Sequence, residues 1–124
     1  MKNYLAIDIG ASSGRHILGT VKDGQINLEE IYRFKNGAEK KGDKLCWNDK
    51  SLFSSIVEGL KKCKELNKIP VSIGIDTWGV DYALLDKEGK IIHEPFHYRD
   101  ERTKDALEKA FSKMSADEIY AETG

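Results

Sequence analysis

Three short apolar segments occupy the first 34 positions of the chain, and the turn signals between them leave few possible folds. Residues 4–9, 15–21 and 26–34 are rich in β-branched and aromatic residues and have the length of strands. The glycine-containing stretch 10–14 separates the first pair, and Lys22-Asp23-Gly24 separates the second. Because such short connections join neighbouring antiparallel strands, we expect the chain to open with a three-stranded β-meander.

A helical pattern follows the meander. Asn48 or Asp49 is placed to cap a helix, and Pro70 prevents its continuation. Residues 36–43, between the meander and the helix, are polar and contain glycine, which predicts a loop or an irregular edge. The apolar positions that recur with helical period are Leu52, Phe53, Ile56, Val57, Leu60 and Cys63.

Further elements complete the predicted fold. Residues 71–75 resemble a buried strand, and 80–85 and 90–93 are two more strand candidates around the turn Asp86-Lys87-Glu88-Gly89. A second amphipathic helix is expected over 107–114, and Ser115 with Glu118 forms a capping box for a short third one. Strands, a helix and then another strand predict an α/β fold with a mixed sheet flanked by helices.

Composition and charge exclude several classes of protein. The 124 residues are 40% hydrophobic and 33% charged, which is typical of a globular chain. Twenty Lys and Arg against 21 Asp and Glu give a net charge of −1, without the basic excess of nucleic-acid or membrane-surface binders. Asp8 interrupts the N-terminal apolar run, so we expect no secretory signal and a cytoplasmic protein. Cys46 and Cys63 follow no metal-binding or disulfide pattern, and Cys63 is expected to pack in the core.

The first candidate site is Asp8 with the loop that follows it. Aspartate is disfavoured within strands, yet Asp8 stands in an apolar run just before Gly10. Gly10 and Gly14 permit positive φ and a close backbone approach, and Arg15 adds a permanent charge. With the hydroxyls of Ser12 and Ser13, the loop can surround phosphate oxygens while Asp8 holds Mg²⁺ through water. A turn-capping aspartate in an ordinary hairpin remains the alternative interpretation.

The second candidate site is the segment 76–82, which follows directly on an apolar strand. Ligand sites in open α/β sheets gather where strands end. Trp78 can stack on a sugar, Asp76 and Asp81 can accept hydrogen bonds from hydroxyls, and Gly79 lets the backbone approach. Trp78 can equally be a core aromatic.

The third segment, 97–103, is expected to be a solvated turn with local ion pairs among Arg99, Asp100 and Arg102. Tyr98 becomes a sugar contact if it faces the same cleft as Gly79. We assign no metal to His93 and His97, because their spacing on an extended segment does not place both on one side.

Several of these strings together resemble a known family. AIDIGASSGRHILG at residues 6–19 resembles the phosphate-loop hairpin of the FGGY carbohydrate kinases, which belong to the actin-like ATPase superfamily. Within that family the rhamnulokinases are the most similar group. The strings that carry this are Arg33-Phe34-Lys35-Asn36-Gly37, Trp47-Asn48, SIGIDTWGVDYALLDKEGKI at 72–91, HYRDERT at 97–103 and Tyr120-Ala121-Glu122-Thr123-Gly124.

The resemblance implies a ribonuclease-H-like lobe, with ATP, Mg²⁺ and L-rhamnulose as ligands. It implies ATP-phosphate contacts for the residues Ala11, Ser12, Ser13, Gly14 and Arg15, a position near the metal and the transferred phosphoryl group for Asp8, and a ketose contact for Gly79. Trp78, Asp81 and Tyr98 as sugar contacts extend the resemblance. It also implies that residues 1–124 are the first part of the N-terminal domain of a longer kinase, with the general-base aspartate and the adenosine contacts elsewhere.

Phosphoryl transfer depends on positioning and charge stabilisation, so we expect the 124 residues alone to be inactive. We also expect them to dimerise through exposed apolar surface or to be poorly soluble. The alternatives are another sugar kinase of the family, acting on fuculose, xylulose or glycerol, a non-catalytic lobe, and a ribonuclease-H-like nuclease with Asp8 and Asp76 as metal ligands.

Overall fold

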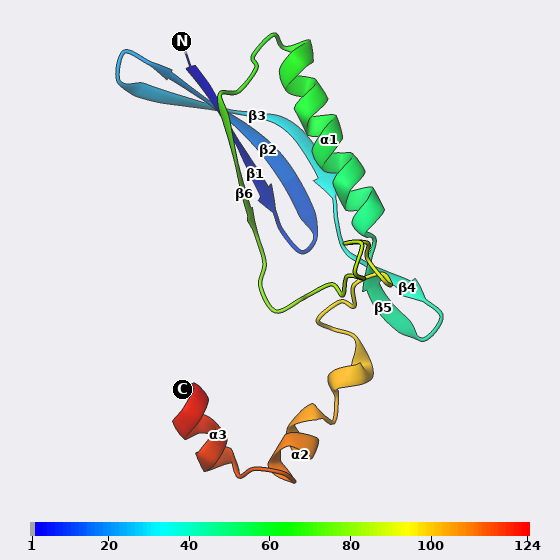
Figure 1. Ribbon diagram of the computed structural model, residues 1–124. Coiled ribbons are helices and arrows are strands. Elements are labelled where there is room, and N and C mark those ends of the chain that lie inside the picture. Colours follow the sequence, from blue (N-terminus) through cyan, green and yellow to red (C-terminus); the bar gives the residue numbers. More distant parts are fainter. Residues whose placement is uncertain (1) are drawn as a thin grey trace.

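The computed structural model describes residues 2–124 and confirms the meander (Figure 1). β1 (Lys2–Ile9), β2 (Ser13–Lys22) and β3 (Gln25–Lys35) pair antiparallel in chain order. Asp23 and Gly24 at the second turn have φ of 52° and 77°, as a two-residue hairpin turn requires.

The fourth strand makes the sheet mixed, as the sequence predicts. β6 (Ser72–Thr77) pairs parallel with β1, giving the order β3-β2-β1-β6. Parallel neighbours need a long crossover, and α1 (Asp49–Glu65) lies within it. The Asn48 side chain caps this helix by accepting a hydrogen bond from the Ser51 amide at 2.9 Å. The α/β mixed-sheet class is therefore confirmed.

The core lies between the sheet and α1, which packs over β2 and β3. Alternate residues of β1 and β2 face the helix, as expected for a sheet with one covered face. The buried cluster consists of Leu5, Ile7, Ile9, Leu18 and Cys63. The predicted packing role of Cys63 is confirmed.

His16 belongs to this interface. The side chain is 0% exposed beneath α1, and its Nε2 donates to the Ile56 carbonyl at 3.1 Å. The ring lies where a Cβ on Gly59 would stand, so a glycine in the helix makes room for the histidine. Nδ1 has no hydrogen-bond partner.

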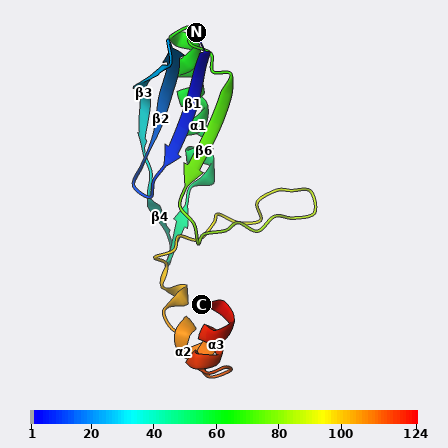
Figure 2. The same ribbon diagram turned by 90° about the vertical axis from the view of Figure 1, so that its left-hand side faces the viewer.

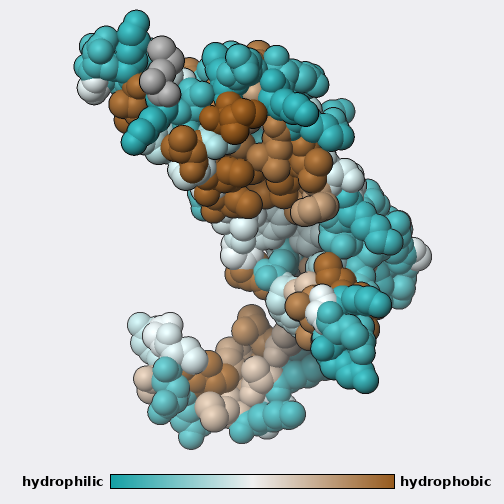
Figure 3. All heavy atoms as spheres, turned by 45° about the horizontal axis from the view of Figure 1, so that its top comes forward, coloured by the Kyte–Doolittle hydropathy of each residue, from teal (hydrophilic) through white to brown (hydrophobic). Residues whose placement is uncertain are grey.

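The prediction that the strand after Pro70 is buried is wrong for these residues. Every residue of β6 is exposed, including Ile73 and Ile75, because α1 covers β2 and β3 and leaves this edge strand open. The other sheet face is also uncovered and apolar, with an open depression of about 460 Å³. Its lining includes Tyr4, Ile17 and Leu28. Figure 3 shows apolar side chains gathered in the region of the sheet. The surface that the predicted dimer needs is therefore present; dimerisation itself stays a prediction.

The polar stretch before the helix is a hairpin rather than a loop. β4 (Ala38–Lys41) and β5 (Lys44–Trp47) pair antiparallel around Gly42, whose φ is 62°. Backbone pairing rather than apolar burial defines β4, so its exposed polar side chains gave no strand pattern.

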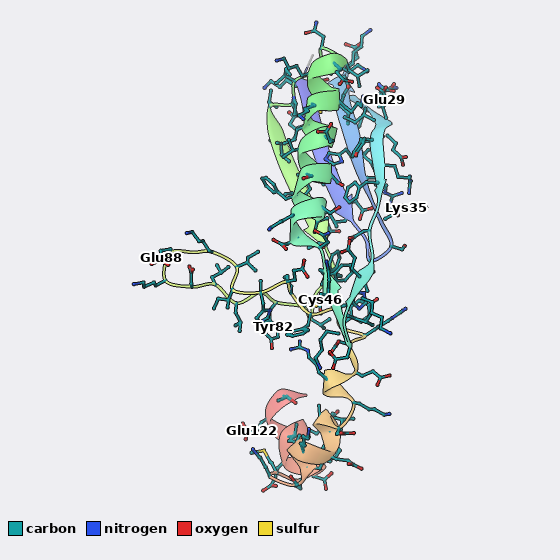
Figure 4. All side chains as sticks on the ribbon, turned by 90° about the vertical axis from the view of Figure 1, so that its right-hand side faces the viewer. Glu29, Lys35, Cys46, Tyr82, Glu88 and Glu122 are labelled. Atoms are coloured by element: carbon teal, nitrogen blue, oxygen red, sulfur yellow. The ribbon has the colours of Figure 1, made fainter. Side chains whose placement is uncertain are left out.

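The strands predicted at 80–85 and 90–93 are absent from the described residues, and a long loop takes their place (Figure 2). Leu85 and Ile91 form an isolated bridge. The turn between them is confirmed, since the Asp86 side chain accepts the Glu88 and Lys90 amides at 2.9 and 2.8 Å. Glu88 lies at the tip of the loop, away from the sheet (Figure 4). The apolar residues of these two stretches stay exposed because no element packs on them.

From residue 101 onward the chain is mostly helical and lies apart from the sheet (Figure 1). The 3₁₀ helix η1 (Glu101–Thr103), α2 (Ala106–Phe111) and α3 (Ala116–Thr123) contain no buried residue. The predicted Ser115–Glu118 capping box is confirmed. Between residues 2 and 124, no helix has the length and apolarity that a membrane crossing requires.

The fit between His16 and Gly59 can be tested by adding one methyl group. Gly→Ala in a helix interior ordinarily stabilises by up to ~1 kcal/mol. Here the methyl meets the His16 ring, so Gly59→Ala should lower the free energy of unfolding by about 1–3 kcal/mol in urea. Gly74→Ala is the control, because no atom lies within 4 Å of its added methyl. A Gly59→Ala chain as stable as the unaltered one would contradict this packing.

Burial also makes stability depend on pH. It lowers the pKa of His16 and of His97 below the ordinary value of 6.5. The folded chain therefore binds protons less readily than the unfolded chain. The contribution of the two neutral histidines to the free energy of unfolding is fully present above pH 6.5. It falls as the pH drops from 6.5 through the pKa values of the folded state. Urea unfolding on both sides of pH 6.5 should show this loss, and His16→Gln should reduce it. His93→Gln, at an exposed site, should leave it unchanged; an unaltered pH dependence in His16→Gln would exclude His16 as a cause.

Candidate functional site

The two glycine-containing segments singled out in the sequence leave the sheet at the same edge. β1 and β6 are parallel neighbours, with Asp8 opposite Asp76 and Ile9 opposite Thr77. The loop after β1 and the Trp78-Gly79 segment after β6 therefore start side by side (Figure 1). This is the carboxyl edge at which α/β proteins place their ligands.

Asn36 fastens the loop between β1 and β2, a role that the sequence did not reveal. Its side-chain Nδ2 donates to the Gly10 carbonyl at 2.8 Å, and its backbone N–H donates to the Ser12 carbonyl at 2.9 Å. Inside the loop, the Gly10 amide donates to the Ser13 carbonyl at 2.9 Å. The loop thus has a fixed shape before any ligand arrives. The available signal was a lone asparagine next to a glycine directly after a strand.

The glycines of this loop serve a different purpose from the predicted one. Neither Gly10 nor Gly14 has positive φ. Gly14 is buried, and the Phe34 ring occupies the place where its Cβ would stand. A Cβ on Gly10 would lie 3.0 Å from the Ser13 carbonyl. Close packing, not left-handed backbone, therefore explains both glycines.

Asp8 and Arg15 form an ion pair across β1 and β2. The Arg15 Nε and terminal nitrogen lie 2.9 and 2.8 Å from Asp8 Oδ2. Their side chains are 42% and 44% exposed, so the pair contributes little stability. The guanidinium can instead exchange this partner for an incoming anion at low cost.

The acidic groups at this edge suit a magnesium ion that keeps most of its water. Asp8 and Asp76 are opposite each other on parallel strands and so share a face of the sheet. Carboxylate oxygens are ligands that Mg²⁺ prefers. Within residues 2–124 no group of three or more His, Cys, Asp or Glu side chains is placed to hold a metal. The pair fits a water-mediated site better than a cage of protein ligands.

An aromatic cluster occupies the other face of the same edge. The Trp47 and Trp78 rings stack with centroids 4.2 Å apart. Both indole N–H groups donate to Asp81 Oδ2, at 2.6 and 2.9 Å. A pocket of about 280 Å³ is lined by both indoles and Asp81, and by Ile9 and Thr77 at the strand ends. Its remaining walls are Asp49, Leu52, Tyr82, Ala83 and Pro95.

Tyr98 extends this cluster through His97. The His97 ring lies 4.3 Å from the rings of both Trp47 and Tyr98. A second pocket of about 300 Å³, which Asp81 shares, lies on this side. Tyr98 is 40% exposed and lines it with Tyr82. Tyr98 is therefore near the Trp78 segment, as the sugar-site hypothesis requires.

In segment 97–103 the predicted ion pair between Arg102 and Asp100 is present at 3.9 Å, but the prediction of a solvated turn is wrong for Asp100. This residue is 5% exposed, and its carboxylate accepts the amides of Leu45 and Arg102 at 2.7 and 3.0 Å. These two backbone donors hold the pKa of Asp100 below its ordinary value. Asp100 therefore attaches the segment to β5 and fixes the position of Tyr98.

The predicted site residues thus form two groups at one edge. Asp8 and Arg15 lie on the face away from α1, while Trp78 and Asp81 lie on the α1 side with Ile9. Gly79 stands in open space, because a Cβ added to it would meet no atom within 4 Å, so a ligand can reach its backbone. Ser12 is exposed and Ser13 is half-buried. The described pocket next to Trp78 reaches Ile9 but not the serines.

Comparison with known proteins identifies the class to which this fold and edge belong. Residues 3–124 match the FGGY family of carbohydrate kinases, N-terminal domain, and the chain belongs to this family. The rhamnulokinase of Ligilactobacillus salivarius is 48% identical over all 124 residues, which cover 26% of that protein. The rhamnulokinase of Bacteroides thetaiotaomicron is 45% identical over 99% of the chain and 25% of that protein.

Solved structures show the same fold at low identity. The xylulose kinase of Lactobacillus acidophilus superposes with a TM-score of 0.78 at 14% identity, over 98% of this chain and 24% of that one. Plasmodium falciparum glycerol kinase superposes with a TM-score of 0.66 at 15% identity, over 91% of this chain and 23% of that one. The chain spans about a quarter of the length of the curated relatives it matches.

Removing one donor should test the role of Asn36 in the loop. The carboxylate of Asn36→Asp cannot donate to the Gly10 carbonyl, so this variant should lose about 1 kcal/mol of unfolding free energy. Hydrogen exchange at the Gly10 amide should become faster, because its bond to Ser13 depends on the closed loop. Asn27→Asp, at an exposed site of β3, the strand that precedes Asn36, is the matched control. Unchanged exchange at Gly10 would show that Asn36 does not hold the loop.

Proposed function

We propose that this chain supplies part of the ATP and sugar site of a kinase that phosphorylates L-rhamnulose at its C1 hydroxyl, giving L-rhamnulose 1-phosphate in rhamnose catabolism. Membership of the FGGY family supports the reaction class, and the identity to rhamnulokinases supports this sugar. The observation that carries the proposal is the parallel pairing of β1 and β6, which starts both candidate segments at one edge.

The loop after β1 takes the phosphates of ATP in this proposal. Ala11 to Gly14 present backbone amides and two hydroxyls around a loop whose shape Asn36 fixes. Arg15 supplies a positive charge beside them and neutralises phosphoryl oxygens once it leaves Asp8. Asp8 would hold Mg²⁺ through water, and the ion would supply positive charge to offset that of the phosphate oxygens.

The segment after β6 receives the sugar. Gly79 offers an unobstructed backbone, and Trp78, Asp81 and Tyr98 form the wall beside it. A general base outside this chain removes the C1 hydroxyl proton as the phosphoryl group transfers. The 124 residues alone position substrates without completing the reaction, so they should release no ADP from ATP and L-rhamnulose.

A chimera tests the function with the missing groups supplied. Residues 1–124 replace the corresponding quarter of the Ligilactobacillus salivarius rhamnulokinase, and ADP release is followed with a panel of ketoses and glycerol. We expect fastest turnover on L-rhamnulose. Asp8→Asn should lower kcat by about 100-fold or more, because the metal and phosphoryl group lose their anchor. Asp43→Asn, at an exposed hairpin position, is the matched control.

The outcomes of this experiment separate the alternatives. A folded chimera that prefers fuculose, xylulose or glycerol would contradict the proposed substrate but support the assignment as a sugar kinase. A folded chimera without phosphoryl transfer would favour a non-catalytic lobe. Divalent-dependent cleavage of nucleic acid by the chain would revive the nuclease, for which Asp8 and Asp76 have the required shared face.

A further inference from the structure

Both tryptophans of the chain take part in one stacked pair. Trp47 ends β5 and Trp78 follows β6, so the pair joins two segments that belong to different sheets. Their ring planes lie at 30° with centroids 4.2 Å apart. Trp47 is only 4% exposed, and Trp78 packs against the core. The pair is thus fixed on its inner side and borders a pocket mainly through Trp78, because Trp47 keeps little exposed surface.

A single carboxylate oxygen connects the two rings. Asp81 Oδ2 accepts from Trp47 Nε1 at 2.6 Å and from Trp78 Nε1 at 2.9 Å. An indole has one donor and no acceptor, so each ring uses its whole hydrogen-bonding capacity here. Within residues 2–124 the two indole N–H groups are the hydrogen-bond donors to the Asp81 side chain.

We propose that Asp81 is a positioning residue whose carboxylate clamps Trp47 and Trp78 into an apolar platform for the deoxygenated end of the sugar. This rests on the proposed function. It adds a supporting role for Asp81 to that of a hydroxyl acceptor, because Oδ2 is engaged by two indole donors while the carboxylate keeps its second oxygen. The apolar surface beside this carboxylate is that of the rings.

The pocket beside the platform is suited to an apolar part of a sugar. Most of its wall consists of the two indoles with Ile9, Leu52, Tyr82, Ala83 and Pro95. A hydroxyl buried against such a wall finds few partners, whereas a methyl group loses nothing. The geometry therefore favours a ketose with a methyl end over one with a hydroxymethyl end at the same position. L-Rhamnulose and L-fructose differ by that one hydroxyl and form a matched pair of ligands.

The clamp can be tested in the 124-residue chain without any kinase activity. Two stacked indoles give an exciton couplet in circular dichroism, and the chain has no third tryptophan to obscure it. Asp81→Asn should weaken the couplet, and Asp81→Leu should abolish it, since leucine offers no acceptor. Trp78→Phe removes one indole and so shows the spectrum without a couplet. Asp43→Asn is the control and should keep the couplet. A couplet of full strength in Asp81→Leu would overturn the clamp.

The platform is tested in the chimera described above, with L-rhamnulose and L-fructose as alternative substrates. The unaltered chimera should prefer L-rhamnulose by about 10-fold or more in kcat/KM. Asp81→Leu should raise KM for L-rhamnulose and change kcat less. The ratio of kcat/KM for L-rhamnulose to that for L-fructose should therefore approach one. An unchanged preference in a variant that has lost its couplet would overturn the platform.

Failure of the clamp and failure of the proposed function give different results. If the unaltered chimera turns over no ketose, the proposed function falls and the platform loses its ligand, while the couplet still decides the clamp. If the chimera is active and Asp81→Leu keeps both couplet and preference, the inference alone is wrong.

Discussion

The parallel pairing of β1 with β6 is the contact on which the rest of the structure depends. It sets Asp8 beside Asp76 and starts the serine loop and the Trp78 segment from one edge. Parallel strands cannot be joined by a tight turn, so the pairing requires a crossover that packs on the sheet. α1 lies in that crossover. Its close packing on the sheet depends on Gly59, which leaves room for the buried His16 ring.

The edge created in this way has two chemically different sides. On one, the Asp8–Arg15 pair is half-exposed and can exchange partners, which suits anions and a hydrated metal. On the other, Trp47 and Trp78 form an apolar wall that Asp81 holds in place. The proposed function requires such different surroundings, for phosphate and for sugar, within a short distance. A sheet supplies both because successive side chains of one strand, such as Asp8 and Ile9, point to opposite faces.

The cover of the sheet is uneven within residues 2–124. α1 buries one face over β2 and β3, while Ile73, Ile75 and the opposite face stay exposed. The chain spans about a quarter of the length of its curated relatives, and the proposed reaction needs groups that this chain does not contain.

The sequence by itself determined the meander, α1 with a cap at Asn48 or Asp49, and the capping box at Ser115, because propensity, periodicity and capping act between residues close along the chain. It also marked Asp8, Gly79 and Trp78 as unusual. Only the tertiary structure decided that β4 is a strand and 80–85 is not, that Asn36 holds the loop, and that Asp81 joins two indoles. Those contacts join residues distant in sequence, so their partners cannot be read from local patterns and depend on which segments the folded sheet brings together.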